Sequence, residues 1–468
     1  MLPRTNNLSM FKKILIFTLI IIIIFFSLTL TPVDRTPYKK LDFYKKSILK
    51  INQQLKENRD ASIGDTLLIG FAKVNLTPSD LAPLAGYGNR RPKEMTKVHD
   101  SIYVNTTVIN NGKNKIAIIS ADLLIIPPEV TLILKEKLFN IDWSLPEIFL
   151  SATHTHSSLG GWAPGLVGNI IAGTYNAKYP ELIASRILRS IQMAEKNMKI
   201  GAWSFNELSI PSLIRNRLVG TQGVTDPYLK LLALKSGIHE GIHAFYGAHA
   251  TCLSSENKQM SRDYPGVFSD WMVSNTSLDF AIYSAGAVAS MGPEMGLQQE
   301  FERSQFVGEE MAKQVALIHQ FGFPYEDQLN IKFFRVPLFL RQPMVKISEN
   351  WAFRPWIFNW AFGQYLLEIS MFQLNDLVMI GLPCDFSGEL AVELYEYAKS
   401  KDLNLIISSF NGGYAGYVPD DKWYDLEKYE PRSMSWYGHD NGAYFVEIVK
   451  LLIDTINHEN QSSHFNHR

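Results

Sequence analysis

An uncharged apolar run close to the N-terminus constrains this chain more than any other feature. Residues 14–31 consist of isoleucine, leucine, phenylalanine, serine and threonine. The run is about 18 residues long, close to the ~20 residues with which an α-helix crosses a bilayer. Arg4, Lys12 and Lys13 precede it, and basic residues tend to remain on the cytoplasmic side. We therefore expect residues 1–13 to form a cytoplasmic tail and the rest of the chain to lie outside, in the periplasm or the extracellular space.

A cleaved signal peptide is the alternative interpretation of this run, because it would show the same basic start and apolar centre. No clear small-x-small cleavage site follows the run. This favours an uncleaved single-pass anchor, whereas cleavage would produce a secreted protein.

The remaining composition is that of a folded protein. The chain has 468 residues, of which 46% are hydrophobic, enough for one large domain or for two to three ordinary ones. Lys plus Arg number 45 and Asp plus Glu number 46. This balance, without a basic stripe, argues against a nucleic-acid partner. Oligomeric state is not indicated.

Cysteine is rare, since Cys252 and Cys384 are the two in the sequence. Their number excludes a scaffold held by many disulfides. The two can either form one bridge or serve as small buried apolar residues.

Hydrophobic spacing predicts a mixed fold. Residues 32–65 are polar with apolar residues at helical spacing, and we expect a stalk there, followed by the folded body at 66–456 and a polar tail at 457–468. The Asn-Gly dipeptide at 111–112 predicts a hairpin. Helices are expected at 130–139 and 180–198, and strands at 67–74, 103–110, 115–120, 147–151, 231–234, 242–246, 281–284, 331–336, 377–380 and 405–407. The expected fold class is α/β (mixed α+β): a single large domain of mixed β-sheets covered by helices, preceded by a transmembrane helix.

Aromatic residues are concentrated at residues 351–362, where the sequence reads Trp-Ala-Phe-Arg-Pro-Trp-Ile-Phe-Asn-Trp-Ala-Phe. One interpretation is packing inside the core. The other is an exposed apolar rim that dips into a membrane or receives an acyl chain.

Two histidines follow a predicted strand directly. His154 and His156 are separated by one residue, so in extended geometry their side chains would face the same side. Such a pair can present one metal ligand and one proton-transfer group to a common cleft. Structural histidines with satisfied hydrogen bonds are the alternative.

The wider sequence resembles the neutral/alkaline non-lysosomal ceramidases. Residues 152–157 with the glycines at 160–161 are similar to the family's His-Thr-His-Ser-x-x-Gly-Gly signature. Tyr417 and Tyr429 resemble its paired tyrosine element. Further similar segments, in the family's order, lie at residues 83–88, 98–100, 120–123, 214–217, 247–251 and 261–266. The resemblance covers residues 67–453, which correspond to the catalytic domain and not to the immunoglobulin-like module of longer members.

The resemblance implies a set of roles. One Zn²⁺ per chain would be held by His154, His249, Asp385 and Tyr417. The ion would lower the pKa of a water molecule from about 15.7 towards ~7. His156 would pass a proton to the leaving amine, while Arg217 and Tyr429 would stabilise the oxyanion, the kind of donor typically worth roughly 10²–10³-fold in rate.

One departure concerns the carboxylate ligand. Asp385 stands where the family usually has glutamate. Aspartate is one methylene shorter, so Glu389 is an alternative ligand, and Cys384 beside it could also bind zinc.

A second departure concerns the serine that contacts the substrate amide in the family. Direct register places Ala287 where the family has aspartate and Ala289 where it has this serine. Ser290 would replace the serine only after a slip of one residue, and it is our candidate for that role.

The function implied by the resemblance is hydrolysis of the N-acyl amide bond of ceramide or a similar N-acyl lipid to a fatty acid and an amine. A membrane anchor agrees with a lipid substrate, because tethering raises effective concentration. The alternatives are a zinc amidase or esterase acting on another acylated substrate, and a degenerate lipid-binding homologue without catalysis.

Overall fold

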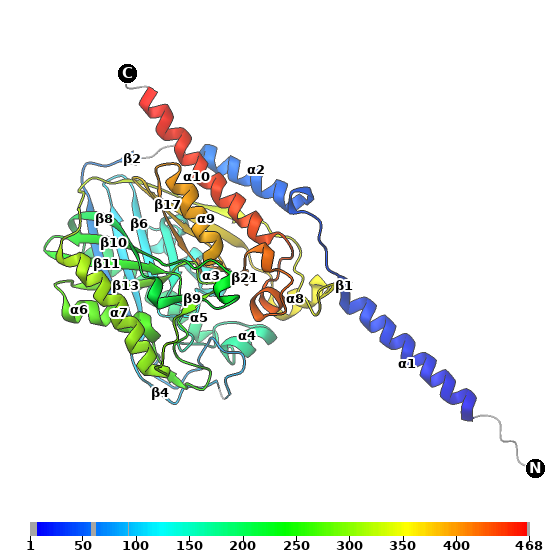
Figure 1. Ribbon diagram of the computed structural model, residues 1–468. Helices are drawn as coiled ribbons and strands as arrows, with labels where there is room; N and C mark the ends of the chain where they lie inside the picture. Colours follow the sequence, from blue (N-terminus) through cyan, green and yellow to red (C-terminus); the bar gives the residue numbers. More distant parts are fainter. Residues whose placement is uncertain (1–6, 58–61, 92, 466–468) are drawn as a thin grey trace, which may run out of the picture.

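Two β-sheets packed face to face position the loops of this protein, and helices cover their outer faces. The computed structural model describes residues 7–57, 62–91 and 93–465. Figure 1 shows one body from which a long N-terminal helix projects. The helices are α1 (Asn7–Thr29), α2 (Asp42–Glu57), α3 (Pro128–Lys137), α4 (Gly165–Ala172), α5 (Lys178–Lys196), α6 (Asp263–Asn275), α7 (Glu300–Gln320), α8 (Pro355–Phe362), α9 (Gly388–Lys399) and α10 (Asn441–Phe465).

The larger sheet has eight strands and the smaller has five. In spatial order the first contains β13 (Phe280–Ala285), β11 (His239–Tyr246), β10 (Tyr228–Ser236), β8 (Lys199–Ser209), β3 (Leu68–Asn75), β5 (Tyr103–Asn110), β6 (Lys115–Ala121) and β7 (Ile148–Ala152). The second contains β2 (Ser62–Ile63), β15 (Asn330–Leu338), β17 (Leu367–Leu374), β18 (Leu377–Gly381) and β20 (Asn404–Ser408). Four two-stranded pairs complete the fold: β1 (Leu30–Pro32) with β16 (Trp351–Phe353), β4 (Lys97–Val98) with β12 (Gln259–Met260), β9 (Ile214–Asn216) with β14 (Met291–Pro293), and β19 (Asp385–Phe386) with β21 (Tyr417–Val418).

Apolar side chains fill the space between the sheets. Phe149 and Phe245 come from the eight-stranded sheet, and Phe372 and Met379 from the five-stranded sheet. Burial on both faces explains why these strands read as continuous apolar runs in the sequence. The mixed α/β prediction is confirmed, and the predicted strands and helices match observed elements to within a few residues.

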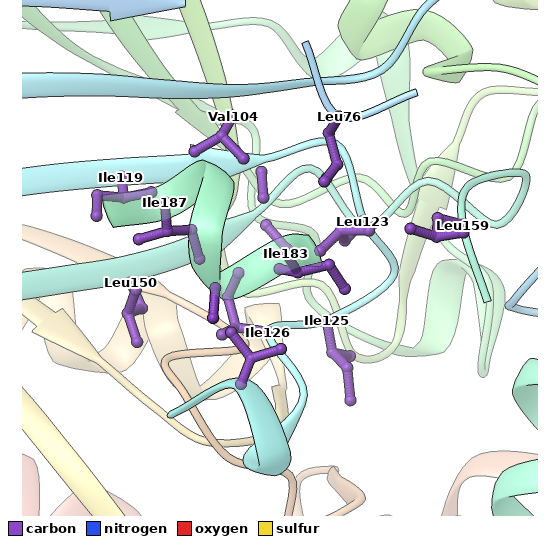
Figure 2. Packing of buried hydrophobic residues seen from close by; sticks show 14 of the residues in the cluster. Leu76, Val104, Ile119, Leu123, Ile125, Ile126, Leu150, Leu159, Ile183 and Ile187 are labelled. Atoms are coloured by element: carbon purple, nitrogen blue, oxygen red, sulfur yellow. The ribbon is translucent and has the colours of Figure 1, made fainter. Parts of the chain in front are cut away.

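A second core lies between the eight-stranded sheet and α5. Ile183 and Ile187 of α5 are one helical turn apart and lie beside Val104 and Ile119 of the sheet (Figure 2). The i, i+4 spacing gives this helix one apolar face, which is the face it buries. Helices α6 and α7 pack beside β13, and α2, α9 and α10 cover the five-stranded sheet.

The two edges of the eight-stranded sheet meet. Strands β13 and β7 stand at opposite ends of the strand order, yet Ser151 Oγ lies 2.6 Å from Ser284 Oγ, and Ser120 Oγ donates to the Tyr283 carbonyl over 2.5 Å. Neighbouring strands rotate by roughly 20–25° per pair, and over a wide sheet this twist brings distant strands together. The loops that leave β7 and β11 therefore approach one another.

Helix α1 confirms the N-terminal apolar helix. Residues 10–29 are long and apolar enough to cross a membrane by length and composition. The helix ends at Thr29, so the last two residues of the predicted run belong instead to β1, which pairs with β16. Residues 1–6 of the predicted tail lie outside the described residues.

The segment expected to form a stalk is partly packed on the body. Helix α2 buries Ile51, which is 1% exposed, in the cluster that includes the five-stranded sheet. Ser47 Oγ lies 2.6 Å from the Tyr444 hydroxyl of α10. The apolar residues at helical spacing thus form a face that docks on the domain. In the segment predicted as a polar tail, α10 continues to Phe465.

The two cysteines do not form a disulfide bridge. Cys252 and Cys384 are free and buried, in separate apolar clusters.

The aromatic segment at residues 351–362 is partly buried. Phe358 is buried, whereas Trp356 and Trp360 are 54% and 69% exposed. The segment therefore has one face in the core and one in solvent.

We predict that Ile51→Ala lowers the free energy of unfolding by about 2–4 kcal/mol, because it removes buried methylenes and leaves a cavity. Leu49→Ala is the matched control on the same helix, since Leu49 is 67% exposed, and it should change stability by less than about 0.5 kcal/mol. Denaturant unfolding of the full chain in detergent measures both. Equal stability of the two variants would mean that α2 is a detached stalk after all.

Candidate active site

A left-handed turn after β7 brings the two histidines together. The strand ends at Ala152, and His154 has a φ of 61°, in the region that non-glycine residues rarely adopt. His154 Nε2 and His156 Nε2 lie 3.1 Å apart, with ring planes at 85°. The expectation of extended geometry is wrong, since the turn, and not the pleat of a strand, aims both rings at one point. Strained backbone of this kind clusters at functional sites.

Backbone carbonyls fix the orientation of three imidazoles. Because a carbonyl oxygen can only accept a hydrogen bond, the Nδ1 atom that contacts it carries the proton, and Nε2 keeps a lone pair that can accept a hydrogen bond or bind a metal. The carbonyls are those of Leu124 for His154 at 2.7 Å, Gly86 for His156 at 3.1 Å and Val288 for His249 at 2.7 Å. The three Nε2 atoms point into one small volume, as potential metal ligands would.

A carboxylate and a phenol complete the group. Strands β19 and β21 pair in parallel with Asp385 opposite Tyr417. Asp385 Oδ1 lies 3.4 Å from His154 Nε2 and 3.3 Å from His249 Nε2, and the Tyr417 hydroxyl lies 3.1 Å from His249 Nε2. Asp385 Oδ2 accepts from the Tyr414 hydroxyl over 2.7 Å, whereas the buried Oδ1 has no hydrogen-bond partner among the described residues.

The charge state of this group suits a cation. Burial lowers the pKa of His154 to about 3 and lowers the pKa of His156 and His249 well below the ordinary value. The imidazoles are therefore neutral at pH 7, which is the form that binds metal. The Nε2 lone pairs of His154 and His156 face one another near Asp385 Oδ1, which has no hydrogen-bond partner among the described residues. A small divalent cation with nitrogen and oxygen ligands fits this donor set.

The structure distinguishes between the candidate carboxylates. Glu389 accepts from the Val224 amide over 2.8 Å and from Trp423 Nε1 over 2.7 Å, so both of its oxygens are engaged away from the histidines. Cys384 lies in an apolar cluster. Asp385 is thus the carboxylate that meets the imidazoles, despite being shorter than glutamate.

Arg217 lies in the loop that follows β9 and contacts the group formed by the histidines and Tyr417. Its Nη2 lies 2.9 Å from His249 Nε2 and donates to the Tyr417 hydroxyl over 3.3 Å, and its Nε donates to Glu430 Oε1 over 2.8 Å. Burial opposes the charged form, but Glu430 and Tyr417 outweigh it and raise the pKa of Arg217. Tyr429 lies next to Tyr417, with ring centroids 6.1 Å apart.

Ser290 is not brought to the histidines. Its amide donates to Glu430 Oε2 over 2.8 Å, and its Oγ lies 3.4 Å from the same oxygen. Ala289 packs in the cluster that contains Tyr417. Ala289, and not Ser290, is therefore the residue of the two that packs in the cluster with Tyr417.

A cavity of about 1420 Å³ opens beside this group. Its polar end is lined by His154, His156, Arg217, Tyr417 and Tyr429. The walls are largely apolar and include Ile125, Val167, Ile171, Leu340, Phe358 and Phe362. A few convergent polar groups at one end of a large apolar cavity are typical of a ligand-binding site.

Sequence reasoning missed three supporting residues. Phe410 stacks on His154 with centroids 4.1 Å apart, Tyr414 holds Asp385, and Glu430 links Arg217 to Ser290. The only signal for Tyr414 was its place in a glycine-rich loop three residues before Tyr417. Glu430 directly follows Tyr429, a residue of the predicted site.

We predict that His154→Ala loses bound metal and that His156→Ala retains it, because His156 is expected to move protons and not to ligate. Metal analysis of each purified variant is the measurement. His239→Ala is the control, since His239 is a solvent-exposed histidine at the other end of β11. Equal metal loss in both site variants would place His156 among the ligands.

Comparison with known proteins gives one family. The family model described as neutral/alkaline non-lysosomal ceramidase, N-terminal, matches residues 67–292. The neutral ceramidase of Pseudomonas aeruginosa is 24% identical over 201 residues, which cover 38% of this chain and 29% of that protein. The matched segment is thus less than a third of the relative's length.

Solved structures show the same fold. The crystal structure of the Pseudomonas aeruginosa neutral ceramidase superposes with a TM-score of 0.71 at 17% identity, covering 86% of this chain and 75% of that one. A ceramidase complexed with C2 superposes with a TM-score of 0.73, also at 17% identity, covering 86% and 76%. The loops that follow β7 and β11, which carry His154 and His249, lie within residues 67–292, the segment that the family model matches. Residues 67–292 of this chain are therefore similar to the N-terminal domain of the neutral/alkaline non-lysosomal ceramidases.

Proposed function

We propose that this protein is a zinc-dependent amidohydrolase that cleaves the N-acyl amide bond of ceramide or a similar N-acyl lipid, releasing a fatty acid and an amine. The observation that carries the proposal is the convergence of His154, His249, Asp385 and Tyr417 at the polar end of a large apolar cavity. The similarity of residues 67–292 to the ceramidase family model supports the same reaction class.

The four converging residues would hold one Zn²⁺. Support comes from the neutral state of the imidazoles and from the unpaired buried oxygen of Asp385. When bound, the ion polarises a carbonyl and lowers the pKa of a nearby water molecule towards ~7. Tyr414 orients Asp385 through its second oxygen, and such supporting contacts typically tune a metal site.

His156 is our candidate for proton transfer. Its Nε2 lone pair faces the same point as His154 Nε2, while the Gly86 carbonyl holds its ring from behind. From there it can accept the proton of an attacking water and deliver it to the nitrogen of the breaking amide.

Arg217 and Tyr429 are our candidates for stabilising the oxyanion. The Arg217 guanidinium stays charged because Glu430 pairs with its Nε, and its Nη2 faces His249 and Tyr417 in the site. The Tyr429 side chain lines the same cavity. Donors aimed at the developing negative charge in a site of low polarity contribute strongly to rate.

The apolar walls of the cavity suit an acyl chain or a sphingoid chain, and burial of each methylene contributes about 0.8 kcal/mol.

The alanine at position 289 favours a second candidate function, because Ala289 lacks the hydroxyl with which the family contacts the substrate amide. That candidate is a zinc amidase or esterase acting on another acylated substrate, and a lipid-binding homologue without catalysis is the limiting case.

We expect the purified full chain to hydrolyse a long-chain ceramide, to lose this activity with a zinc chelator and to regain it when Zn²⁺ is added back. N-acyl amino acids and simple esters assayed in parallel separate the two enzymatic candidates. His154→Ala serves as the inactive control. Protein that contains one equivalent of zinc and hydrolyses none of these substrates would support the lipid-binding alternative and contradict the proposal.

Replacing Ala289 by serine should raise kcat, by up to roughly 10²-fold if the restored hydroxyl contacts the amide, a gain typical of one well-placed donor. Ser290→Ala should leave kcat nearly unchanged, because its Oγ faces Glu430 and not the cavity. Steady-state kinetics on ceramide measure both variants. A large fall in kcat for Ser290→Ala would instead favour the slipped register.

A further inference from the structure

The end of α1 is bonded to the start of α8. The Arg354 amide donates to the Thr29 carbonyl over 2.9 Å, and Arg354 Nε donates to the Ser27 carbonyl over 3.0 Å. Trp356 Nε1 donates to the Leu28 carbonyl over 2.9 Å. These donors satisfy carbonyls that the last turn of a helix leaves without partners. Pairing of β1 with β16 continues the contact, so α1 is fixed to α8 and is not attached through a loose linker.

The length of α1 places this contact at a bilayer surface. Its apolar part runs from Met10 to Thr29, 20 residues, which at 1.5 Å per residue is about 30 Å, the thickness of the hydrocarbon core. If Met10 lies at one surface, Thr29 lies at the other. Arg354 and Trp356 then lie at the membrane–water boundary, where tryptophan is enriched in membrane proteins.

Helices α4 and α8 expose apolar side chains next to this boundary. The two helices pack against each other. On α8, Trp356 and Trp360 are exposed; on α4, Leu166 and Ile170 are 52% and 40% exposed. Figure 1 shows α8 beside the junction of α1 with β1, and α4 next to α8. We call these four side chains the α4–α8 rim.

The same two helices line the cavity, and Ile170 of the rim is itself part of the cavity wall. Val167 and Ile171 of α4, and Phe358 and Phe362 of α8, belong to the cavity wall. The rim therefore lies directly beside the cavity wall. A lipid that enters between these helices passes from one apolar environment to another without crossing water, which avoids the cost of exposing its chains.

We propose that the α4–α8 rim docks into the leaflet from which α1 emerges, so that the cavity takes its lipid directly from that leaflet. The docking surface depends on α1 crossing a bilayer, and the identity of the lipid rests on the proposed function. The occupant is the acyl and headgroup boundary of a lipid bilayer, recognised through indole and aliphatic side chains.

The first test locates the rim without needing turnover. Trp360→Cys and the control Ile238→Cys are each labelled with an environment-sensitive fluorophore in the full chain, reconstituted in phosphatidylcholine vesicles that contain nitroxide-labelled lipid. Ile238 is 91% exposed and precedes β11, whose far end leads to His249, so it lies about 26 Å of strand away from the site. The native cysteines are buried, and unsubstituted protein provides the background.

We expect the nitroxide lipid to quench the label at position 360 and not the label at position 238. Equal, weak quenching at both positions would overturn the proposal. Mature protein that begins after Thr31 would also overturn it, because the bonds from α8 to α1 could not exist. Since neither readout involves catalysis, a failure here is distinguishable from a failure of the proposed hydrolysis.

The second test measures delivery of lipid. With the full chain in vesicles, Trp360→Glu should lower hydrolysis of long-chain ceramide in the same vesicles by about tenfold, the effect of roughly one lost indole contact. Hydrolysis of a water-soluble short-chain N-acyl substrate should not change, since Trp360 is outside the cavity wall. Ile238→Glu should change neither rate. Unaltered hydrolysis of the bilayer substrate by Trp360→Glu would contradict the proposal.

Discussion

The meeting of the two edges of the eight-stranded sheet is the constraint on which the site depends. Ser151 of β7 and Ser284 of β13 share a buried hydrogen bond, and His243 Nε2 lies 2.6 Å from Ser284 Oγ. Buried hydroxyls of this kind are costly unless paired, so the contact fixes the register of one edge against the other. The histidine loops leave β7 and β11 close to this contact. A flat sheet with the same strands would hold His154 and His249 far apart.

The second sheet positions the oxygen atoms proposed as ligands, because its strands end at the same place. β18 leads to Asp385, and β20 leads to the loop that carries Tyr417. Apolar packing between the sheets therefore sets the distance between nitrogen and oxygen donors. Ligand sites at the ends of strands are common for this reason, because rigid elements position loops that are free to vary. Arg217 and Glu430 then close the group from a third direction.

Sequence patterns predicted the elements well and the local turns poorly. Continuous apolar runs identified the strands because both sheets are buried on two faces. The grouping of His154, His249, Asp385 and Tyr417 came from resemblance, since residues so distant in the chain have no local signal. The left-handed turn at His154 escaped prediction because tertiary contacts, and not propensity, stabilise it. Helix α2 looked like a stalk because its polar face dominates its composition, although its apolar spacing was visible. Glu389 and Asp385 were indistinguishable in sequence, and only the hydrogen bonds to Val224 and Trp423 separate them.

The pairing of β19 with β21 fixes the separation of Asp385 and Tyr417. Asp385 and Tyr417 are directly opposite residues of a backbone-bonded pair, so their separation is set by main-chain geometry and hardly at all by side-chain rotamers. His154, His156 and His249 are likewise held by carbonyls. Small zinc domains fold only as their ion binds. Here backbone carbonyls and the pairing of β19 with β21 hold the candidate donor atoms, so under the proposed function we expect ion loading to be a binding event and not a folding event.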